Sequence, residues 1–188
     1  MGRWEPDARG RLAKAALDLY SERGFEQTTA AEIARRAGLT ERTFFRHYAD
    51  KREVLFASSP AMQDVFVAAV AGAEPSAAAM EALAAGYDAV SGFFADRRDF
   101  ARKRQDVVLQ NAELLERELM KLASLAAALA GALRQRGVAP AEASLAAEAG
   151  VAVFKVGFER WVAPGEERDM AQLMRAALAE LGSLAGGA

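Results

Sequence analysis

The residues best suited to bind another molecule lie close together between positions 35 and 52. Six basic side chains occur here: Arg35, Arg36, Arg42, Arg46, Lys51 and Arg52. Only Glu41 and Asp50 oppose them, and aromatic residues are interleaved with them in "ERTFFRHY" (41–48). Guanidinium and ammonium groups neutralise phosphates, and an arginine fork matches a guanine edge. The pattern therefore indicates contact with a polyanion at this end of the chain.

The composition argues against metal and cysteine chemistry. The 188 residues include no cysteine and a single histidine, His47, which leaves no thiol nucleophile and almost no zinc ligands. A lone histidine without a nucleophile or acid partner does not indicate a catalytic site. We therefore expect no enzyme activity, no cofactor and no metal. The net charge is −2, so the basic cluster belongs to an otherwise acidic chain.

Helix is favoured nearly everywhere, because alanine and leucine dominate and no window alternates with period two. The sequence predicts an all-α fold. A first helix is expected over about 7–23, and Thr29 with Glu32 forms a capping box before a short second helix. Thr40 is the expected cap of the next helix, and Asp50 that of a longer helix that starts at Lys51 and bends near 58–60.

Two short helices joined by the turn at Gly38 fit a helix-turn-helix over about 29–48, whose second helix would enter the DNA major groove. Phe44 and Tyr48 lie four residues apart and are expected to pack in the core, together with Leu12 and Ile33. The DNA-facing side is expected to carry the residues on the opposite face of the helix: Glu41, Arg42, Thr43, Phe45 and Arg46.

The segment "GFEQTTAAEIARRAGLTERTFFRHYADKREVLF" (24–56) resembles the DNA-binding region of the tetracycline-repressor (TetR) family. The shared features are a Gly-Phe, a Thr pair, Ile-Ala, Ala-Gly, a capping Ser or Thr, a Thr followed by aromatics, and a Lys after a short turn. The similarity extends over roughly residues 9–56. The rest of the chain resembles the family only in length, helicity and an apolar C-terminal helix pair.

The resemblance implies a set of DNA-contacting positions: Thr29, Thr40, Glu41, Arg42, Thr43, Phe45, Arg46, His47 and Lys51. According to this resemblance, Thr29 and Thr40 cap helices whose N-terminal amides contact DNA phosphates, and Lys51 binds a phosphate. Glu41 and Arg42 depart from the residues common in the family. Arg42 would read guanine and Glu41 would accept from cytosine, unless Glu41 only complements the helix dipole.

Beyond Gly72 the sequence predicts long amphipathic helices at about 76–95, 98–110, 112–136, 141–162 and 167–184. A set of aromatic and methionine residues either lines an effector pocket or forms plain core: Tyr87, Phe93, Phe94, Phe100 and Met120. The charged run 96–106 either binds an acidic effector or is a solvated face, and the second reading is favoured.

The last two predicted helices carry more apolar surface than one subunit is expected to cover. We expect them to form the face of a homodimer, although the same spacing serves internal packing. The residues predicted at this dimer face are Gly150, Phe154, Phe158, Leu173, Leu178 and Leu181. The predicted organisation is a DNA-binding domain at 1–56 and a C-terminal antiparallel helical domain at 57–188 for effector binding and dimerisation.

These patterns together favour a transcriptional regulator, in which a homodimer binds a pseudo-palindromic double-stranded DNA operator and a hydrophobic small-molecule effector releases it. The alternatives are an effector-independent regulator or activator of the same fold, or an all-α enzyme or partner-binding bundle. The N-terminus lacks a signal-peptide core, and no charge-free stretch approaches the roughly 18 residues that span a bilayer. We therefore expect a cytoplasmic protein with no membrane partner.

Overall fold

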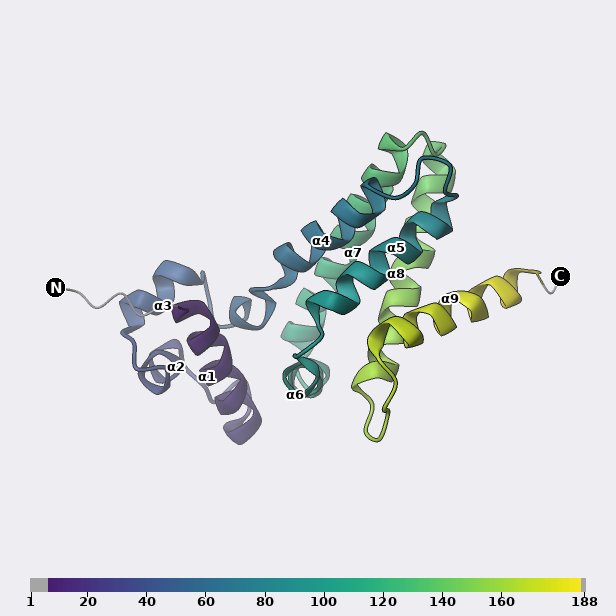
Figure 1. The fold of residues 1–188 in the computed structure, drawn as a ribbon. Coiled ribbons are helices and arrows are strands. Elements are labelled where there is room, and N and C mark those ends of the chain that lie inside the picture. The colour runs from purple at the N-terminus through teal and green to yellow at the C-terminus, as the bar shows by residue number, and fades with distance from the viewer. Residues whose placement is uncertain (1–6, 187–188) are drawn as a thin grey trace. The chain divides into compact units, whose positions relative to one another are not determined.

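The computed structural model describes residues 7–186, and the regular elements in this range are all helical (Figure 1). The helices are α1 (Ala8–Arg23), α2 (Ala30–Arg36), α3 (Glu41–His47), the 3₁₀ helix η1 (Glu53–Phe56), α4 (Ser59–Ala71), α5 (Ala79–Phe93), α6 (Arg98–Leu109), α7 (Ala112–Gln135), α8 (Pro140–Val162) and α9 (Met170–Gly186). The predicted all-α fold is confirmed for these residues. The first six and last two residues of the predicted domains lie outside the described range.

The chain forms two compact units. Among the described residues, the first contains 7–59 together with Lys103–Glu118, and the second contains Pro60–Arg102 together with 119–186. The predicted single boundary after residue 56 therefore needs one correction, since 103–118 packs with the N-terminal helices. The physical reason is apolar burial: Val107, Val108 and Leu114 lie in the same core as the side chains of α1 and η1.

The first unit is built around the inner faces of α1, α2 and α3. Leu12, Ile33 and Phe44 are completely buried, and Tyr48 is nearly so, as the sequence predicted. Burying an aliphatic or aromatic side chain contributes about 1.5–3 kcal/mol each, so this shared core stabilises α2 and α3, whose seven residues each are too few to persist as isolated helices. The Tyr48 hydroxyl donates to the carbonyl oxygen of Arg9 at 3.2 Å, which joins the end of α3 to the start of α1.

The helix predicted to start at Lys51 is replaced by a tighter turn. The Asp50 carboxylate accepts hydrogen bonds from the backbone amides of Arg52 and Glu53, at 2.8 and 3.2 Å. This side-chain capping of two successive amides favours a short turn. The chain follows it as η1, and α4 begins only at Ser59. Asp50 is thus a cap, as predicted, but of a 3₁₀ turn.

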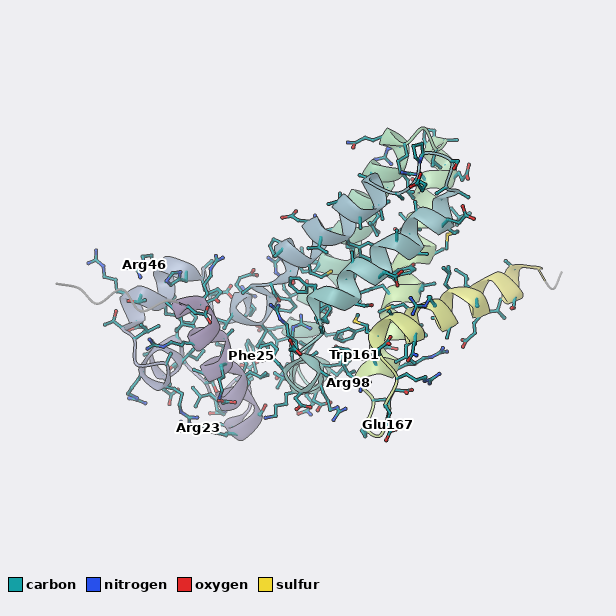
Figure 2. The ribbon with its side chains drawn as sticks, in the orientation of Figure 1. Arg23, Phe25, Arg46, Arg98, Trp161 and Glu167 are labelled. Carbon is teal, nitrogen blue, oxygen red and sulfur yellow. The ribbon has the colours of Figure 1, made fainter. Side chains whose placement is uncertain are left out.

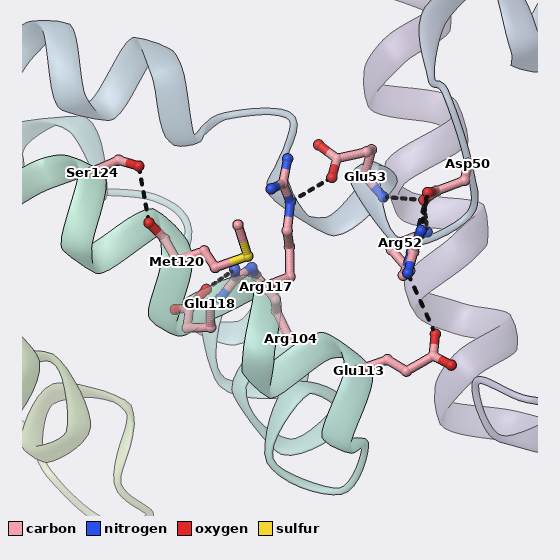
Figure 3. A network of polar contacts seen from close by, with 9 residues as sticks. All are labelled: Asp50, Arg52, Glu53, Arg104, Glu113, Arg117, Glu118, Met120 and Ser124. Atoms are coloured by element: carbon pink, nitrogen blue, oxygen red, sulfur yellow. Dashed lines mark hydrogen bonds and ion pairs between the residues drawn. The ribbon is translucent and has the colours of Figure 1, made fainter.

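A hydrogen bond and an ion pair attach residues 103–118 to η1 within the first unit, and a further ion pair lies inside this segment (Figure 3). Arg104 donates through Nε to the carbonyl oxygen of Leu55 at 2.8 Å, and through Nη2 to Glu118 at 2.6 Å. Arg117 Nε lies 2.6 Å from an oxygen of Glu53. The Arg104–Glu118 pair is largely shielded from solvent, so it is less screened than a typical surface pair.

Close helix approaches at glycine organise the second unit. A Cβ on Gly86 of α5 would lie 2.2 Å from the Phe66 ring of α4, and one on Gly157 of α8 would lie 2.5 Å from the sulfur of Met174 in α9. The Tyr87 hydroxyl donates to the Gly150 carbonyl oxygen at 2.9 Å, which joins α5 to α8. These contacts place α5 and α9 against α8 (Figure 1).

The last helix begins three residues later than predicted. The side chain of Asp169 accepts from the amide of Gln172 at 2.7 Å, and the Gln172 side chain accepts from the amide of Asp169 at 3.1 Å. This reciprocal capping box fixes the start of α9 at Met170. At the other end of α9, Leu184 is 81% exposed.

One stretch, Glu53–Ala71, is long and apolar enough to cross a membrane by length and composition. Its apolar side chains are divided between two protein cores: Val54, Leu55 and Phe56 are buried in the first unit, and Phe66 and Val70 in the second. Core helices pass the same test, so the stretch alone is weak support for a membrane span.

Candidate nucleic-acid interface

Two threonine caps define the start of the two helices in the predicted helix-turn-helix. The Thr29 hydroxyl accepts from the amide of Glu32 at 3.2 Å, while the Glu32 carboxylate accepts from the amide of Thr29 at 3.0 Å. The Thr40 hydroxyl accepts from the amide of Thr43 at 3.1 Å. Both predicted caps are therefore confirmed. Thr29 and Thr40 are exposed, so the helix N-termini that they cap face solvent.

The turn between α2 and α3 requires glycine. Gly38 has a φ of 68°, in the left-handed region that side chains with a Cβ rarely adopt. The amide of Leu39 donates to the carbonyl oxygen of Ala34 at 2.8 Å, which closes the end of α2. Arg11 of α1 also donates to the carbonyl oxygen of Ala37. The turn between the two helices is thus held by a backbone hydrogen bond and by a side-chain hydrogen bond from α1.

The α3 helix presents two different faces. Phe44 is fully buried, whereas Phe45, the next residue, is 53% exposed although its ring meets Phe44 edge-on at 5.3 Å. Arg42 and Arg46 are exposed on the outer side, and Figure 2 shows Arg46 at the outer edge of the first unit. The predicted division into a core face and an outer face is confirmed. An exposed phenylalanine between two arginines suits a surface that another molecule covers.

The basic side chains of the cluster have different surroundings. Arg36 forms a forked pair with Glu22 at 2.8 and 3.0 Å, and Arg52 pairs with Asp50 at 2.7 Å. No ion pair is present for three others within residues 7–186: Arg35, Arg42 and Arg46. These three exposed guanidinium groups are the ones available to an anionic partner without first breaking an internal pair.

Lys51 is engaged inside the first unit. Its Nζ donates to the carbonyl oxygens of Phe25, Glu26 and Thr28, at 2.9, 3.3 and 3.2 Å. The ammonium group also lies 4.2 Å from the centre of the Phe25 ring. Three carbonyl partners use all three donors of the ammonium group. The phosphate contact that the resemblance implies for Lys51 stays a prediction, and the structure gives this residue a second role in fixing the loop after α1.

His47, Thr43 and Glu41 complete the predicted DNA-contacting set on α3. The Thr43 hydroxyl lies 2.9 Å from that of Thr40, so both hydroxyls are already partnered. Glu41 occupies the first position of α3 and is exposed, which is compatible with both the base-contact and the helix-dipole readings. His47 is half-buried on the last turn, and its Nε2 is enclosed without a hydrogen-bond partner. Contacts of the set with DNA stay predictions.

The five residues considered for an effector pocket have different surroundings. Tyr87 is in the core against Phe66, and Phe94 packs against Trp161 with ring centres 5.9 Å apart. Phe93 lies beside Phe94, whereas Phe100 and Met120 are 37% and 54% exposed. Tyr87 and Phe94 thus have the packing role of the alternative reading, and an effector pocket lined by members of this set stays a prediction.

The second unit contains a pocket of about 500 Å³ lined by none of those five residues. It lies between the C-terminal half of α5 and the segment leading into α9, and its lining includes Arg98, Trp161 and Glu167 (Figure 2). Among its lining residues, only Arg98 lies in a segment that the sequence singled out for effector binding, the charged run 96–106, because the lining comes from four separate segments.

Much of the predicted dimer face is internal. Gly150, Phe154, Phe158 and Leu173 are buried in the core of their own subunit, and only Leu178 and Leu181 are partly exposed. Phe158 packs against Phe94 and Trp161. The prediction is corrected for the four buried residues. The four-residue spacing of Gly150, Phe154 and Phe158 serves packing of α8 inside the subunit, and Leu173 is buried in the same core from α9. The outer side of α8 instead exposes other apolar residues, Leu145 at 73% and Val156 at 38%.

The charged run 96–106 has a structural role that neither earlier reading included. Arg98 and Arg102 donate through Nε to the carbonyl oxygens of Trp161 and Val162, at 2.9 and 2.8 Å. Both arginines therefore cap the C-terminal end of α8, where carbonyl oxygens lack helical partners and the helix dipole favours cations. Such long-range capping leaves no local sequence signal.

Comparison with known proteins finds a family match for the N-terminal region. Residues 12–57 match the family profile described as bacterial regulatory proteins, tetR family. The HTH-type transcriptional regulator TcmR of Streptomyces glaucescens is 36% identical over 88 residues, which cover 45% of this chain and 37% of TcmR. The match thus spans less than two thirds of that relative's length.

Solved structures extend the similarity along most of the chain. The fold resembles FadR from Bacillus subtilis in complex with stearoyl-CoA, with a TM-score of 0.64, 21% identity, and coverage of 92% of this chain and 96% of that one. It also resembles FadR from Thermus thermophilus in complex with lauroyl-CoA, a TetR-family repressor, with a TM-score of 0.57, 25% identity and 93% coverage of each chain. These similarities support the fold beyond the N-terminal region.

Proposed function

We propose that the chain is a member of the tetR family of bacterial regulatory proteins, whose profile matches residues 12–57, and that it is a sequence-specific DNA-binding transcriptional regulator. The observation that carries the proposal is the division of α3 into two faces. Phe44 and Tyr48 hold the helix in the core, while Arg42, Phe45 and Arg46 remain exposed on the other side. A helix fixed in this way presents charged and apolar groups that suit phosphates and base edges.

Individual residues take separate roles in this proposal. Arg42, near the N-terminus of α3, reads a guanine by donating to O6 and N7. Arg46 and Arg35 neutralise phosphates, because both are exposed and neither has an ion pair within the described residues. The capped N-termini of α2 and α3 add backbone amides at the same surface. Base contacts set the sequence preference, and phosphate contacts set the affinity and its dependence on salt.

The regulator acts as a homodimer in this proposal. Leu145, Ala152 and Val156 are exposed and lie on one side of α8, since their spacings of seven and four residues return to the same face. Leu184 of α9 adds further exposed apolar surface. Pairing of these outer faces would hold two recognition helices one DNA turn apart, about 34–36 Å, on a pseudo-palindromic operator.

We propose repression that a hydrophobic small molecule relieves. The two FadR structures of similar fold contain stearoyl-CoA and lauroyl-CoA, so acyl-CoA thioesters are the first class to test. An effector shifts the equilibrium only if it binds the non-DNA conformation more tightly than the DNA-bound one. The proposal includes no catalytic step and places the protein in the cytoplasm, where its DNA is. An activator, or a regulator without an effector, would share the same DNA surface.

Selection of bound fragments from the source genome tests this proposal. The protein should retain a small set of double-stranded fragments that share a pseudo-palindromic sequence, including DNA near its own gene. Acyl-CoA thioesters of different chain lengths, and then other hydrophobic metabolites, should be screened for release of these fragments. Enrichment of no common sequence would reject sequence-specific regulation. Enrichment without release by any compound would favour the effector-independent alternative.

A further inference from the structure

His47 is the one imidazole in the chain, and it lies beside the surface proposed to meet DNA. It occupies the last turn of α3, directly after the exposed Arg46. Of the side-chain types that proteins use near neutral pH, only histidine has an unperturbed charge change between about pH 5 and 8. Any proton uptake by side chains in that range is therefore expected to report mainly on this residue.

The surroundings of His47 are cationic. Arg46 and Tyr48 are its neighbours in the chain, and the positive charge of Arg9 in α1 also acts on it. The Arg9 segment is held there because its carbonyl oxygen accepts from the Tyr48 hydroxyl at 3.2 Å. The guanidinium carbon of Arg9 lies 6.0 Å from the centre of the Tyr48 ring. No carboxylate pairs with His47 within residues 7–186.

This arrangement favours the neutral imidazole in the free protein. Its Nε2 is enclosed and has no hydrogen-bond acceptor, so a proton at that nitrogen would be unsatisfied. Burial lowers the pKa of His47 below its usual value, and the nearby charges of Arg46 and Arg9 lower it further. The free protein therefore holds two permanent cations next to a third group that stays uncharged near neutral pH.

DNA phosphates reverse the sign of the local charge. A phosphate that approaches Arg46 or Arg9 neutralises the repulsion that keeps His47 unprotonated and attracts an imidazolium in its place. We propose that His47 takes up a proton when DNA binds, so that affinity for DNA rises as the pH falls through the titration of this single imidazole. The inference deepens the proposed function and depends on it, because it concerns the same DNA surface.

The sign follows from linkage. A group whose pKa is higher in the DNA complex than in the free protein adds affinity that is fully present below the free pKa. The added affinity is lost as the pH rises through the bound pKa. If the two pKa values differ by about one unit, each subunit gains up to about tenfold in affinity, and a dimer up to about a hundredfold. For a difference of about one unit, proton uptake peaks at about half a proton per subunit midway between the two values.

Binding to DNA as a function of pH tests the inference directly. A random-sequence duplex of about 30 base pairs at low salt is a sufficient probe, because phosphates drive the effect. Affinity should rise steadily from pH 8 to pH 5.5 for the unaltered protein. The variant His47→Gln, which keeps a polar side chain without the titrating charge, should lose most of this rise. The same slope in both proteins would overturn the proposal.

A spectroscopic measurement follows the residue itself. The single histidine gives one set of imidazole signals in NMR, so its pKa can be measured in the free protein and in the DNA complex without assignment by mutation. The proposal predicts a higher pKa in the complex. An unchanged or lower pKa, in a protein that does bind DNA, would overturn this inference alone. Absence of DNA binding at every pH would overturn the proposed function and this inference together.

Discussion

The ammonium nitrogen of Lys51 lies 2.9 Å from the carbonyl oxygen of Phe25 and 4.2 Å from the centre of the same residue's ring. The two residues are 26 positions apart, so the contact joins the turn before η1 to the loop after α1. Glu26 and Thr28 supply the other two carbonyl oxygens. Lys51, which was expected to contact DNA, thus connects two segments within the first unit.

Replacing Lys51 should therefore reduce stability. Lys51→Met keeps much of the side-chain length but leaves three carbonyl oxygens without their donor. A hydrogen bond to a charged group or a cation–π contact contributes about 1–3 kcal/mol. These contributions are not additive, so we expect the free energy of unfolding of Lys51→Met to fall by about 1–3 kcal/mol in total. Denaturant unfolding measures this. Lys14→Met is the matched control, since Lys14 is 76% exposed in a surface pair and its loss should cost less than about 0.5 kcal/mol.

The same variant separates the two roles of Lys51. If the ammonium group stays on its carbonyl partners in the DNA complex, the dependence of DNA affinity on salt should be unchanged in folded Lys51→Met. A decrease in the salt slope of about one per subunit would instead support the phosphate contact that the family resemblance implies.

Arg42→Ala should reduce sequence preference. The loss of one two-pronged contact with guanine should cost about 1–3 kcal/mol on the operator and relax the preference at one position per half-site. Fragment selection with the variant, followed by titration of single-base operator changes, measures both effects. Arg36→Ala removes an equal charge that is paired with Glu22, and it should leave base preference intact. Equal losses on operator and random DNA would show that Arg42 contacts only phosphate.

Val156→Glu should separate the subunits without unfolding them. Val156 is 38% exposed in the monomer, so a carboxylate there is tolerated until a second subunit covers it. Burying that charge without a partner costs several kcal/mol, which a dimer avoids by dissociating. Sedimentation should show monomers, and operator affinity should fall sharply while the helical signal is kept. Ala127→Glu, at an exposed position on α7, should leave the dimer intact.

Phe158→Glu gives a contrasting outcome. Phe158 is 9% exposed and packs against Phe94 and Trp161, so a carboxylate there should destabilise the second unit itself. A Phe158→Glu protein that remains folded but becomes monomeric would contradict the internal position of this residue and return it to the dimer face.

Gly86→Ala tests the close approach of α4 and α5. The added Cβ would lie 2.2 Å from a ring carbon of Phe66 and 3.0 Å from a methyl group of Val70, both buried. Overpacking of this kind costs about 1–3 kcal/mol, which should appear as a lower free energy of unfolding. Gly92→Ala lies in the same helix with nothing within 4 Å of the new Cβ. That change should be neutral or should stabilise by up to about 1 kcal/mol.

The first three helices could be predicted from the sequence because their signals are local. The caps at Thr29 and Thr40 accept from amides three residues away. The four-residue spacing of Phe44 and Tyr48 indicates which face of α3 is buried. A single helix from Lys51 was wrong, since Asp50 can cap either an α-helix or a 3₁₀ turn and the sequence does not distinguish them.

The contacts between distant segments could not be predicted. Arg104 bonds the carbonyl oxygen of Leu55, 49 residues away, and Arg98 bonds that of Trp161, 63 residues away. Neither arginine differs in local pattern from a solvated charge. Phe154 and Phe158 illustrate a second limit, because apolar residues four apart serve a neighbouring helix of the same subunit as well as one of a partner.

The most direct test of the central claim is the affinity of the protein for a selected genomic fragment and for a random duplex, measured across a range of salt concentrations. Sequence-specific regulation through α3 predicts a linear fall of log affinity with log salt on both DNAs and a preference of about a thousandfold or more for the selected fragment. The double variant Arg42→Ala, Arg46→Ala should lose most of that preference. Equal affinity for both DNAs, or a preference that survives in the double variant, would contradict the assignment of α3 as the recognition element.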